Sequence, residues 1–132
     1  MDPFEILFSG NKKIDVRFKN FLLNTDQSKE NGGDETAPEP FELFLASLGA
    51  CAGIYARVFC ETRKIDTSGM KLTLEAFFKE NQKLMEKVEL TLLVDPSFPE
   101  RYVKPIIKAM QGCAVKNQLH PDIRTETRVL YP

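Results

Sequence analysis

The segment PFELFLASLGACAGIYARVFCETRK, residues 40–64, decides the fold that this sequence predicts. Its apolar side chains recur every three or four positions, which is the spacing that gives a helix one apolar face. Pro40 suits the first turn of a helix, and the Glu42 carboxylate suits the positive end of the helix dipole. Arg63 and Lys64 suit the negative end. We therefore expect one long helix across this segment.

The middle of the expected helix, residues 43–56, contains 14 consecutive uncharged residues. A run of that length is too short to cross a bilayer and predicts a buried core helix. Gly49 and Gly53 lie four positions apart on one side, although a glycine inside a helix costs roughly 1 kcal/mol relative to alanine. We therefore expect another backbone to approach the helix closely at these two positions.

The composition predicts one domain, residues 1–132, without features of a nucleic-acid-binding or secreted protein. The net charge is -1, and no cationic run is longer than Lys12–Lys13, which argues against nucleic acid and anionic membranes as partners. The N-terminal sequence lacks the basic start and cleavage site of a secretory signal, and no stretch reaches transmembrane length. We expect a cytoplasmic protein.

The flanking segments predict an α+β fold of mostly antiparallel strands packed on helices, in the order β-β-β-α-β-β-α-α-β. Apolar and polar residues alternate in the segments expected to form strands. In chain order, the prediction is a three-stranded meander (residues 4–24), a polar loop (26–39), the long helix, a hairpin with a polar turn (70–94, turn 79–83), a helix (99–111), a short helical segment (114–119) and a last strand (123–130).

The three cysteines are too few and too widely spaced for a disulfide scaffold or a usual zinc site. There is no Cys-x-x-Cys, and His120, next to Pro121, is the single histidine and is expected in a turn. The three cysteines are therefore either all inert core residues, or two of them form a functional pair and the third is structural. On the helical wheel Cys60 lies about 180° from Cys51, so we expect it to be structural.

Cys51 and Cys113 each have two interpretations. A cysteine in an apolar helix is usually a small hydrophobe, and burial would raise the pKa of the Cys51 thiol. Cys113 follows Gly112 and precedes a short helical segment, where free N–H groups would lower its pKa and leave the sulfur accessible. The alternative is that Cys113 is buried beneath the preceding helix.

Two motifs resemble those of the OsmC-like proteins, which include the organic hydroperoxide resistance proteins. PFELFLASLGAC, residues 40–51, is similar to the central helix of that family, and GCAVKNQL, residues 112–119, is similar to its second cysteine segment. The resemblance covers nearly the whole chain. It implies an intertwined homodimer in which the central helices lie between two sheets and the paired cysteines lie at the subunit interface.

The resemblance also implies a thiol-dependent peroxidase that reduces organic hydroperoxides in oxidative-stress defence. Cys51 and Cys113 would be the catalytic redox pair, without metal or organic cofactor, and an external dithiol would reduce them. Hydroperoxide-reducing members use an arginine from the N-terminal strands, and Arg17 is the only arginine before the helix. It could equally be a solvated strand residue. We expect the two sulfurs to face one another across a small apolar cavity, with this arginine within reach of Cys51.

The helix also departs from the pattern of the organic hydroperoxide resistance branch. That branch has a glutamate where this chain has Phe41, and Glu42 is expected to serve the helix N-terminus instead. Tyr55, one turn after Cys51, is expected in core packing with a hydroxyl that could reach the site. The loss of the glutamate motivates the alternative of a non-catalytic dimeric protein that binds a small apolar or lipid-like ligand.

Overall fold

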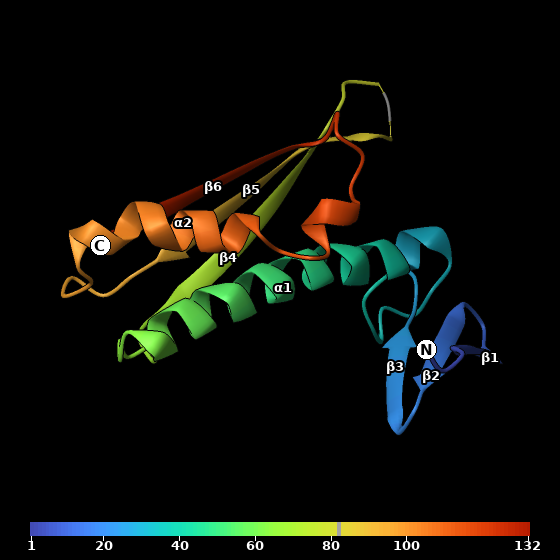
Figure 1. Cartoon of the computed structure of the whole chain (residues 1–132). Helices are drawn as coiled ribbons and strands as arrows, with labels where there is room; N and C mark the ends of the chain where they lie inside the picture. The colour runs from blue at the N-terminus through green and yellow to red at the C-terminus, as the bar shows by residue number, and fades with distance from the viewer. Residues whose placement is uncertain (82) are drawn as a thin grey trace. The chain divides into compact units, whose positions relative to one another are not determined.

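The computed structural model describes residues 1–81 and 83–132, which form two compact units, Met1–Phe44 and Leu45–Pro132 (Figure 1). The boundary between the units falls inside one continuous helix, so the expected single domain over residues 1–132 stays a prediction. The predicted polar turn at residues 79–83 includes Gln82, which lies outside the described residues.

The first unit contains the expected meander. β1 (Glu5–Gly10), β2 (Lys13–Phe18) and β3 (Phe21–Thr25) form an antiparallel sheet in the order β1-β2-β3. Gly10 and Asn11 adopt positive φ values of 109° and 46° at the first turn, a conformation that glycine and asparagine tolerate best.

Strand pairing gathers apolar side chains on one face of this sheet. Ile6 pairs with Val16 and Val16 with Leu23, while the alternate positions pair Glu5 with Arg17 and Asp15 with Asn24. Because side chains alternate between the faces of a strand, one face is apolar except for Thr25, which pairs with Ile14. We call it the open apolar face, because several of its members are solvent-exposed. It consists of Ile6, Phe8, Ile14, Val16, Phe18, Phe21 and Leu23.

Hydrogen bonds to one carboxylate order the loop between β3 and the long helix, which includes a short 3₁₀ helix, η1 (Lys29–Asn31). Asp26 is fully buried and accepts hydrogen bonds from the backbone N–H and the hydroxyl of Thr36, at 3.0 and 2.6 Å, and from the N–H of Gln27 at 2.8 Å. A Cβ at Gly33 would lie 2.1 Å from the Gln27 carbonyl oxygen, so only glycine fits there. The polar loop expected at residues 26–39 is therefore well organised.

The long helix, α1, spans Pro40–Thr62, two residues shorter than predicted. Lys64 adopts φ 55°, and the N–H of Ile65 bonds to the Cys60 carbonyl at 2.9 Å. These features form a Schellman-type ending, in which a left-handed residue closes the helix. Glycine is usual at that position, so the lysine gave no signal of where the helix would end.

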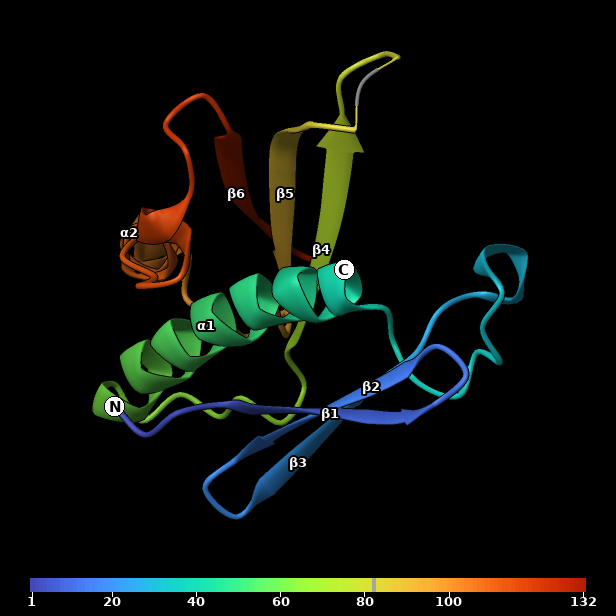
Figure 2. The ribbon, with the colours of Figure 1, turned by 90° about the vertical axis from the view of Figure 1, so that its right-hand side faces the viewer.

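The second unit contains a second three-stranded sheet and the remaining helices. β4 (Lys71–Phe78), β5 (Met85–Leu93) and β6 (Arg124–Leu130) lie in the order β4-β5-β6 (Figure 2). β4 and β5 are antiparallel, whereas β5 and β6 are parallel. Between them the chain forms η2 (Glu100–Tyr102), α2 (Val103–Gln111) and η3 (Lys116–Gln118). The predicted α+β order is confirmed, and the last predicted helix is a single 3₁₀ turn.

Helices α1 and α2 cover the apolar face of this second sheet. Val88, Leu90 and Leu92 of β5 are buried in one cluster with residues from both helices, including Ile106 and Met110 of α2. The alternate residues of β5 face away and form ion pairs, for example between Lys87 and Glu89 at 2.8 Å. This unit therefore has a complete hydrophobic core.

The glycines of α1 face side chains rather than backbone. A Cβ at Gly49 would lie 3.7 Å from Leu74 Cδ1, and a Cβ at Gly53 would lie 3.9 Å from Leu72 Cδ2. These are ordinary van der Waals distances. The prediction of close backbone contact at these two glycines is therefore wrong within this chain.

By length and composition α1 could cross a membrane, because an 18-residue window reaches a mean hydropathy of 1.7. The prediction that no segment reaches this length therefore does not hold. Core helices of soluble proteins share the property, and Leu48, Ala52, Ala56 and Phe59 of α1 pack into the core of the second unit. We therefore treat α1 as a core helix with one buried face.

Candidate functional site

Two cysteines from distant parts of the chain meet in the second unit. Cys51 lies in α1 and is half-buried, whereas Cys113 lies just after α2 and is only 1% exposed. The two thiols are hydrogen-bonded to one another, with the S–H of Cys113 donating to the Cys51 sulfur. The fold thus brings the two predicted cysteines together.

A tight turn after α2 presents backbone N–H groups to both sulfurs. The N–H of Cys113 bonds to the Met110 carbonyl at 3.3 Å, and the N–H of Asn117 bonds to the Cys113 carbonyl at 3.1 Å. We call residues 113–117 the cysteine turn. Within it, the N–H groups of Ala114 and Val115 donate to the Cys51 sulfur. The N–H of Lys116 donates to Cys113 Sγ at 3.5 Å.

These contacts move the pKa values of the two thiols in opposite directions. Burial opposes ionisation of Cys51, but the hydrogen bonds from Cys113, Val115 and Ala114 outweigh it and lower the pKa of Cys51 below its ordinary value. Burial raises the pKa of Cys113, and its role as hydrogen-bond donor to Cys51 raises it further. Cys51 is therefore the thiol that ionises first, and Cys113 supplies a proton to the hydrogen bond.

The structure decides between the two interpretations of each cysteine. Cys113 matches the alternative of a thiol buried beneath the preceding helix, and its pKa is raised. Burial does oppose ionisation of Cys51, as expected, but the hydrogen bonds to its sulfur lower its pKa overall. The reason is that Ala114 and Val115 direct their N–H groups toward the neighbouring sulfur on α1 rather than toward Cys113 alone.

Comparison with known proteins identifies the fold. The profile of the OsmC-like protein family matches residues 32–128, which is most of the chain. The chain belongs to the OsmC-like family. No curated protein matches the sequence.

Solved structures of OsmC-like proteins share this fold at low sequence identity. An osmotic stress induced and detoxification response protein from Psychrobacter arcticus superposes with a TM-score of 0.85 at 18% identity, covering 98% of this chain and 96% of that one. An OsmC-like protein from Mycoplasma pneumoniae gives 0.79 at 14% identity, with coverage of 98% and 95%. An organic hydroperoxide resistance protein from Elizabethkingia anophelis gives 0.71 at 19% identity, with coverage of 100% and 98%.

The other candidate residues of this OsmC-like chain lie apart from the pair or in the other unit. Cys60 is fully buried, its Sγ lies 3.9 Å from Met70 Sδ, and burial raises its pKa, as expected for a structural thiol. Arg17 lies on β2 and pairs with Glu5 at 3.0 Å. Because Arg17 belongs to the first unit, its approach to Cys51 stays a prediction.

Two further predicted residues have defined local roles. The Glu42 carboxylate accepts a hydrogen bond from the Glu39 N–H at 2.9 Å, so it caps the start of α1 as expected. Tyr55 is 37% exposed, and a Cβ built on Gly112 would lie 3.9 Å from its ring. Tyr55 therefore packs next to the residue that precedes Cys113. Phe41 lies near Phe44 in the first unit, with ring centroids 5.6 Å apart.

Sequence reasoning missed the backbone of the cysteine turn. Ala114, Val115 and Lys116 contribute N–H groups, which any residue except proline carries, so their side chains gave no signal. The only available sign was the position of Cys113 directly after a helix end at Gly112.

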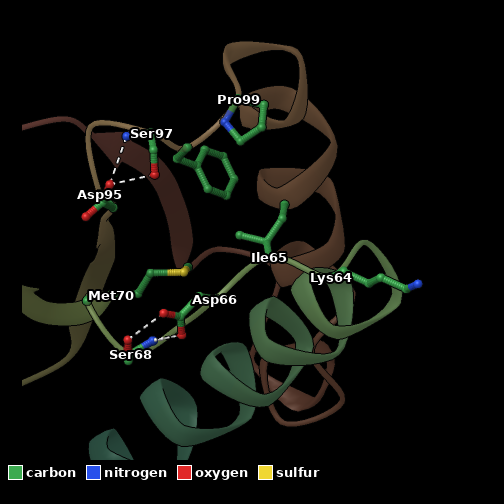
Figure 3. Close-up of a pocket in the computed structure, with 10 residues that line it drawn as sticks. Lys64, Ile65, Asp66, Ser68, Met70, Asp95, Ser97 and Pro99 are labelled. Carbon is green, nitrogen blue, oxygen red and sulfur yellow. Dashed lines mark hydrogen bonds between the residues drawn. The ribbon is translucent and has the colours of Figure 1, made fainter.

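A pocket of about 380 Å³ at the end of α1 contains two aspartates (Figure 3). Asp66 accepts hydrogen bonds from the N–H and hydroxyl of Ser68 at 3.0 and 2.8 Å, and Asp95 accepts them from Ser97 at 2.9 and 2.6 Å. These bonds lower the pKa of each carboxyl. In the part of the chain that the structure describes, no three His, Cys, Asp or Glu residues gather in a group that could hold a metal. The carboxylates serve local turns, and the thiol pair remains the candidate site.

Proposed function

We propose that this OsmC-like protein is a thiol-dependent peroxidase that reduces organic hydroperoxides in oxidative-stress defence. The family and its named structural neighbours point more generally to a redox protein of peroxide stress. The observation that carries the finer assignment is the hydrogen-bonded pair of thiols with opposite pKa shifts. A nucleophilic thiolate beside a protonated partner is the arrangement that a two-cysteine peroxidase requires.

The proposed reaction uses the two thiols in turn. The Cys51 thiolate attacks the distal oxygen of the hydroperoxide, the O–O bond breaks, and the alkoxide takes a proton and leaves as an alcohol. Cys51 becomes a sulfenic acid. The Cys113 sulfur then attacks the Cys51 sulfur, water leaves, and a disulfide forms. An external dithiol reduces it, and the reaction needs no metal or organic cofactor.

The contacts of the cysteine turn support this order of events. The N–H groups of Ala114 and Val115 stabilise negative charge on Cys51. Arg17 would add a positive charge if it reaches Cys51, and Tyr55 could contact the substrate from one turn further along α1.

Replacing Cys51 tests the proposed function directly. Purified Cys51→Ser should lose consumption of tert-butyl hydroperoxide in the presence of dithiothreitol, while Cys60→Ser should retain it, because Cys60 is buried next to Met70. Undiminished hydroperoxide consumption by Cys51→Ser would show that the protein does not use this mechanism.

A second candidate function is the binding of a small apolar or lipid-like ligand without catalysis. The observation in its favour is an apolar groove of about 500 Å³ between α1 and α2, lined by Ile54, Tyr55, Val58, Phe59, Thr62, Arg63 and Ala109. Its volume lies in the range of ligand sites. Native mass spectrometry distinguishes the two functions. A co-purifying ligand without peroxide-dependent thiol loss favours binding, and thiol loss at Cys51 and Cys113 favours the enzyme.

We also propose a cytoplasmic homodimer. The open apolar face supports a dimer, because Phe8 and Phe21 are 87% and 66% exposed in the single chain. Exposed apolar patches of this kind commonly mark protein interfaces.

A further inference from the structure

The two sulfurs of the pair differ in how a second molecule could reach them. Cys51 is half-buried, whereas Cys113 is 1% exposed. Beside Cys113 lies a cavity of about 10 Å³, whose lining includes Leu48, Ala52, Val88, Leu90 and Met110. A cavity of this size holds at most one water molecule, so it has no room for a thiol reagent.

Thiol–disulfide exchange imposes a direction of approach. The attacking thiolate must approach a disulfide sulfur roughly in line with the S–S bond, from the side opposite the leaving sulfur. Cys113 is 1% exposed among the residues around the small cavity, so attack on it requires those residues to move aside. Cys51 is only half-buried, so a thiolate meets less protein on its way to that sulfur.

We propose that the reductant attacks the sulfur of Cys51 and that Cys113 is the leaving group. This inference rests on the proposed function, because it concerns the Cys51–Cys113 disulfide which that reaction produces. A thiolate of the reductant forms a bond to Cys51 Sγ, and the bond between the two cysteine sulfurs breaks. Cys113 leaves with the electron pair and then takes a proton.

The cysteine turn is arranged to receive the leaving sulfur. The N–H of Lys116 lies 3.5 Å from Cys113 Sγ, and the N–H of Val115 also favours its charged form. Once Cys51 carries the reductant, it no longer bears the negative charge that opposes ionisation of Cys113. Both effects help Cys113 to depart as a thiolate.

One effect opposes this choice. The thiol with the lower pKa is the better leaving group, and that thiol is Cys51, which by itself would favour attack on Cys113. Access decides instead, because attack on Cys113 first requires the core around it to open.

A dithiol completes the cycle, and a monothiol does not complete it in one encounter. After the first step the reductant is joined to Cys51 by a mixed disulfide. The second thiol of a dithiol attacks the reductant's own bonded sulfur, closes a disulfide within the reductant and releases the Cys51 thiolate. We therefore expect a monothiol to remain attached to Cys51.

Peptide mapping of the mixed disulfide tests the proposal. The protein carrying Cys60→Ser is oxidised with diamide, treated briefly with glutathione, and trapped with N-ethylmaleimide. Trypsin separates Cys51, in residues 30–57, from Cys113, in residues 109–116. We expect glutathione on Cys51 and maleimide on Cys113 in at least a tenfold excess over the reverse. Glutathione mainly on Cys113, or an even distribution, would overturn the proposal.

A second measurement applies if the mixed disulfide does not accumulate. Cys51→Ser and Cys113→Ser, each with Cys60→Ser, are labelled in urea on their single remaining thiol with thionitrobenzoate and refolded. Because the leaving group is the same in both, the rate of its release by dithiothreitol reports how readily each protein sulfur is attacked. We expect release from Cys51 to be at least ten times faster than from Cys113, and equal rates would contradict the inference.

These experiments use no hydroperoxide, so the two proposals can fail separately. If the protein has no peroxidase activity but its glutathione adduct lies on Cys51, only the proposed function is contradicted. If the protein is a peroxidase but its adduct lies on Cys113, only this inference is contradicted.

Discussion

The two sheets of this protein have the same number of strands but bury their apolar faces differently. In the second unit, Val88, Leu90 and Leu92 of β5 lie beneath helices and are at most 4% exposed. In the first unit, Phe8 and Phe21 of the open apolar face are 87% and 66% exposed. One sheet has its own core, and the other exposes apolar side chains.

This difference separates folding from assembly. A sheet of three strands is stable in water when its apolar face packs against something. The second unit meets that condition within one chain. The first unit contains an ordered loop around Asp26 but leaves its open apolar face exposed, which is why we assign that face to the proposed dimer.

The largest effect should come from a truncation in the buried sheet. Leu90→Ala should lower the free energy of unfolding by about 2–5 kcal/mol, because it removes a side chain that is 4% exposed and leaves a cavity. Urea denaturation measures the loss. Glu126→Ala, on the opposite face of the same sheet, is the control and should change stability by less than about 0.5 kcal/mol. Similar losses of stability in both variants would contradict the assignment of Leu90 to the core face of this sheet.

A charge on the open apolar face should weaken assembly rather than folding. Phe8→Asp should raise the dimer dissociation constant at least tenfold, which corresponds to about 1.4 kcal/mol, because the dimer would have to bury a carboxylate. Sedimentation velocity over a range of concentrations measures this. Leu22→Asp, on the other face of the same sheet, is the matched control and should leave the dimer intact. A wild-type protein that is monomeric at every concentration tested would contradict the proposed homodimer.

The loop of the first unit should respond to acid in a defined range. The hydrogen bonds from Thr36 lower the pKa of Asp26 to about 2 from 3.8, so ionised Asp26 stabilises the folded loop. That contribution is complete above about pH 4 and is lost as the pH falls toward 2. The protection of the Gln27 and Thr36 amides against hydrogen exchange, relative to their intrinsic rates, should fall across this range. In Asp26→Asn the acid dependence should disappear, whereas Asp2→Asn should keep it.

The smallest expected effect concerns the cap at the start of α1. Glu42→Gln keeps a hydrogen-bond acceptor for the Glu39 N–H but removes the negative charge near the helix dipole, so it should cost about 0.3–1 kcal/mol. Thermal unfolding at low and high salt measures this, and the cost should shrink as salt screens the charge. Glu42→Ala should cost more, because it also removes the acceptor. Peroxidase activity should be unchanged in Glu42→Gln.

The parts of the fold that were predictable depend on local patterns. The spacing of apolar residues after Pro40 predicted α1, and the alternation in residues 13–18 predicted β2. The ending of α1 was not predictable, because Lys64 occupies a left-handed conformation that usually indicates glycine. The parallel pairing of β5 with β6 was also not predictable, because alternation within a strand carries no information about the direction of its neighbour.

The sequence predicted which two cysteines form the candidate site but not the hydrogen bonds and pKa values of their thiols. The motifs around Cys51 and Cys113 led to two thiols that do meet. Which thiol has the lower pKa depends on where the N–H groups of Ala114 and Val115 point, and that is a property of the folded turn. Backbone N–H groups determine the electrostatics, so side-chain identity alone left open whether Cys113 is accessible or buried.

The parallel arrangement of β5 and β6 also has a consequence for sequence variation. Parallel neighbours require the intervening chain to travel back along the sheet, and here α2 and the cysteine turn lie on that return path. The length of this connection therefore sets the position of Cys113 relative to α1. An insertion of a few residues after Gly112 could be absorbed by the loop before β6 without disturbing the sheet, yet it would displace one sulfur from the other. Variants with such insertions should thus survive a selection that requires only a folded protein. They should be lost from a selection that requires the reaction of the two thiols.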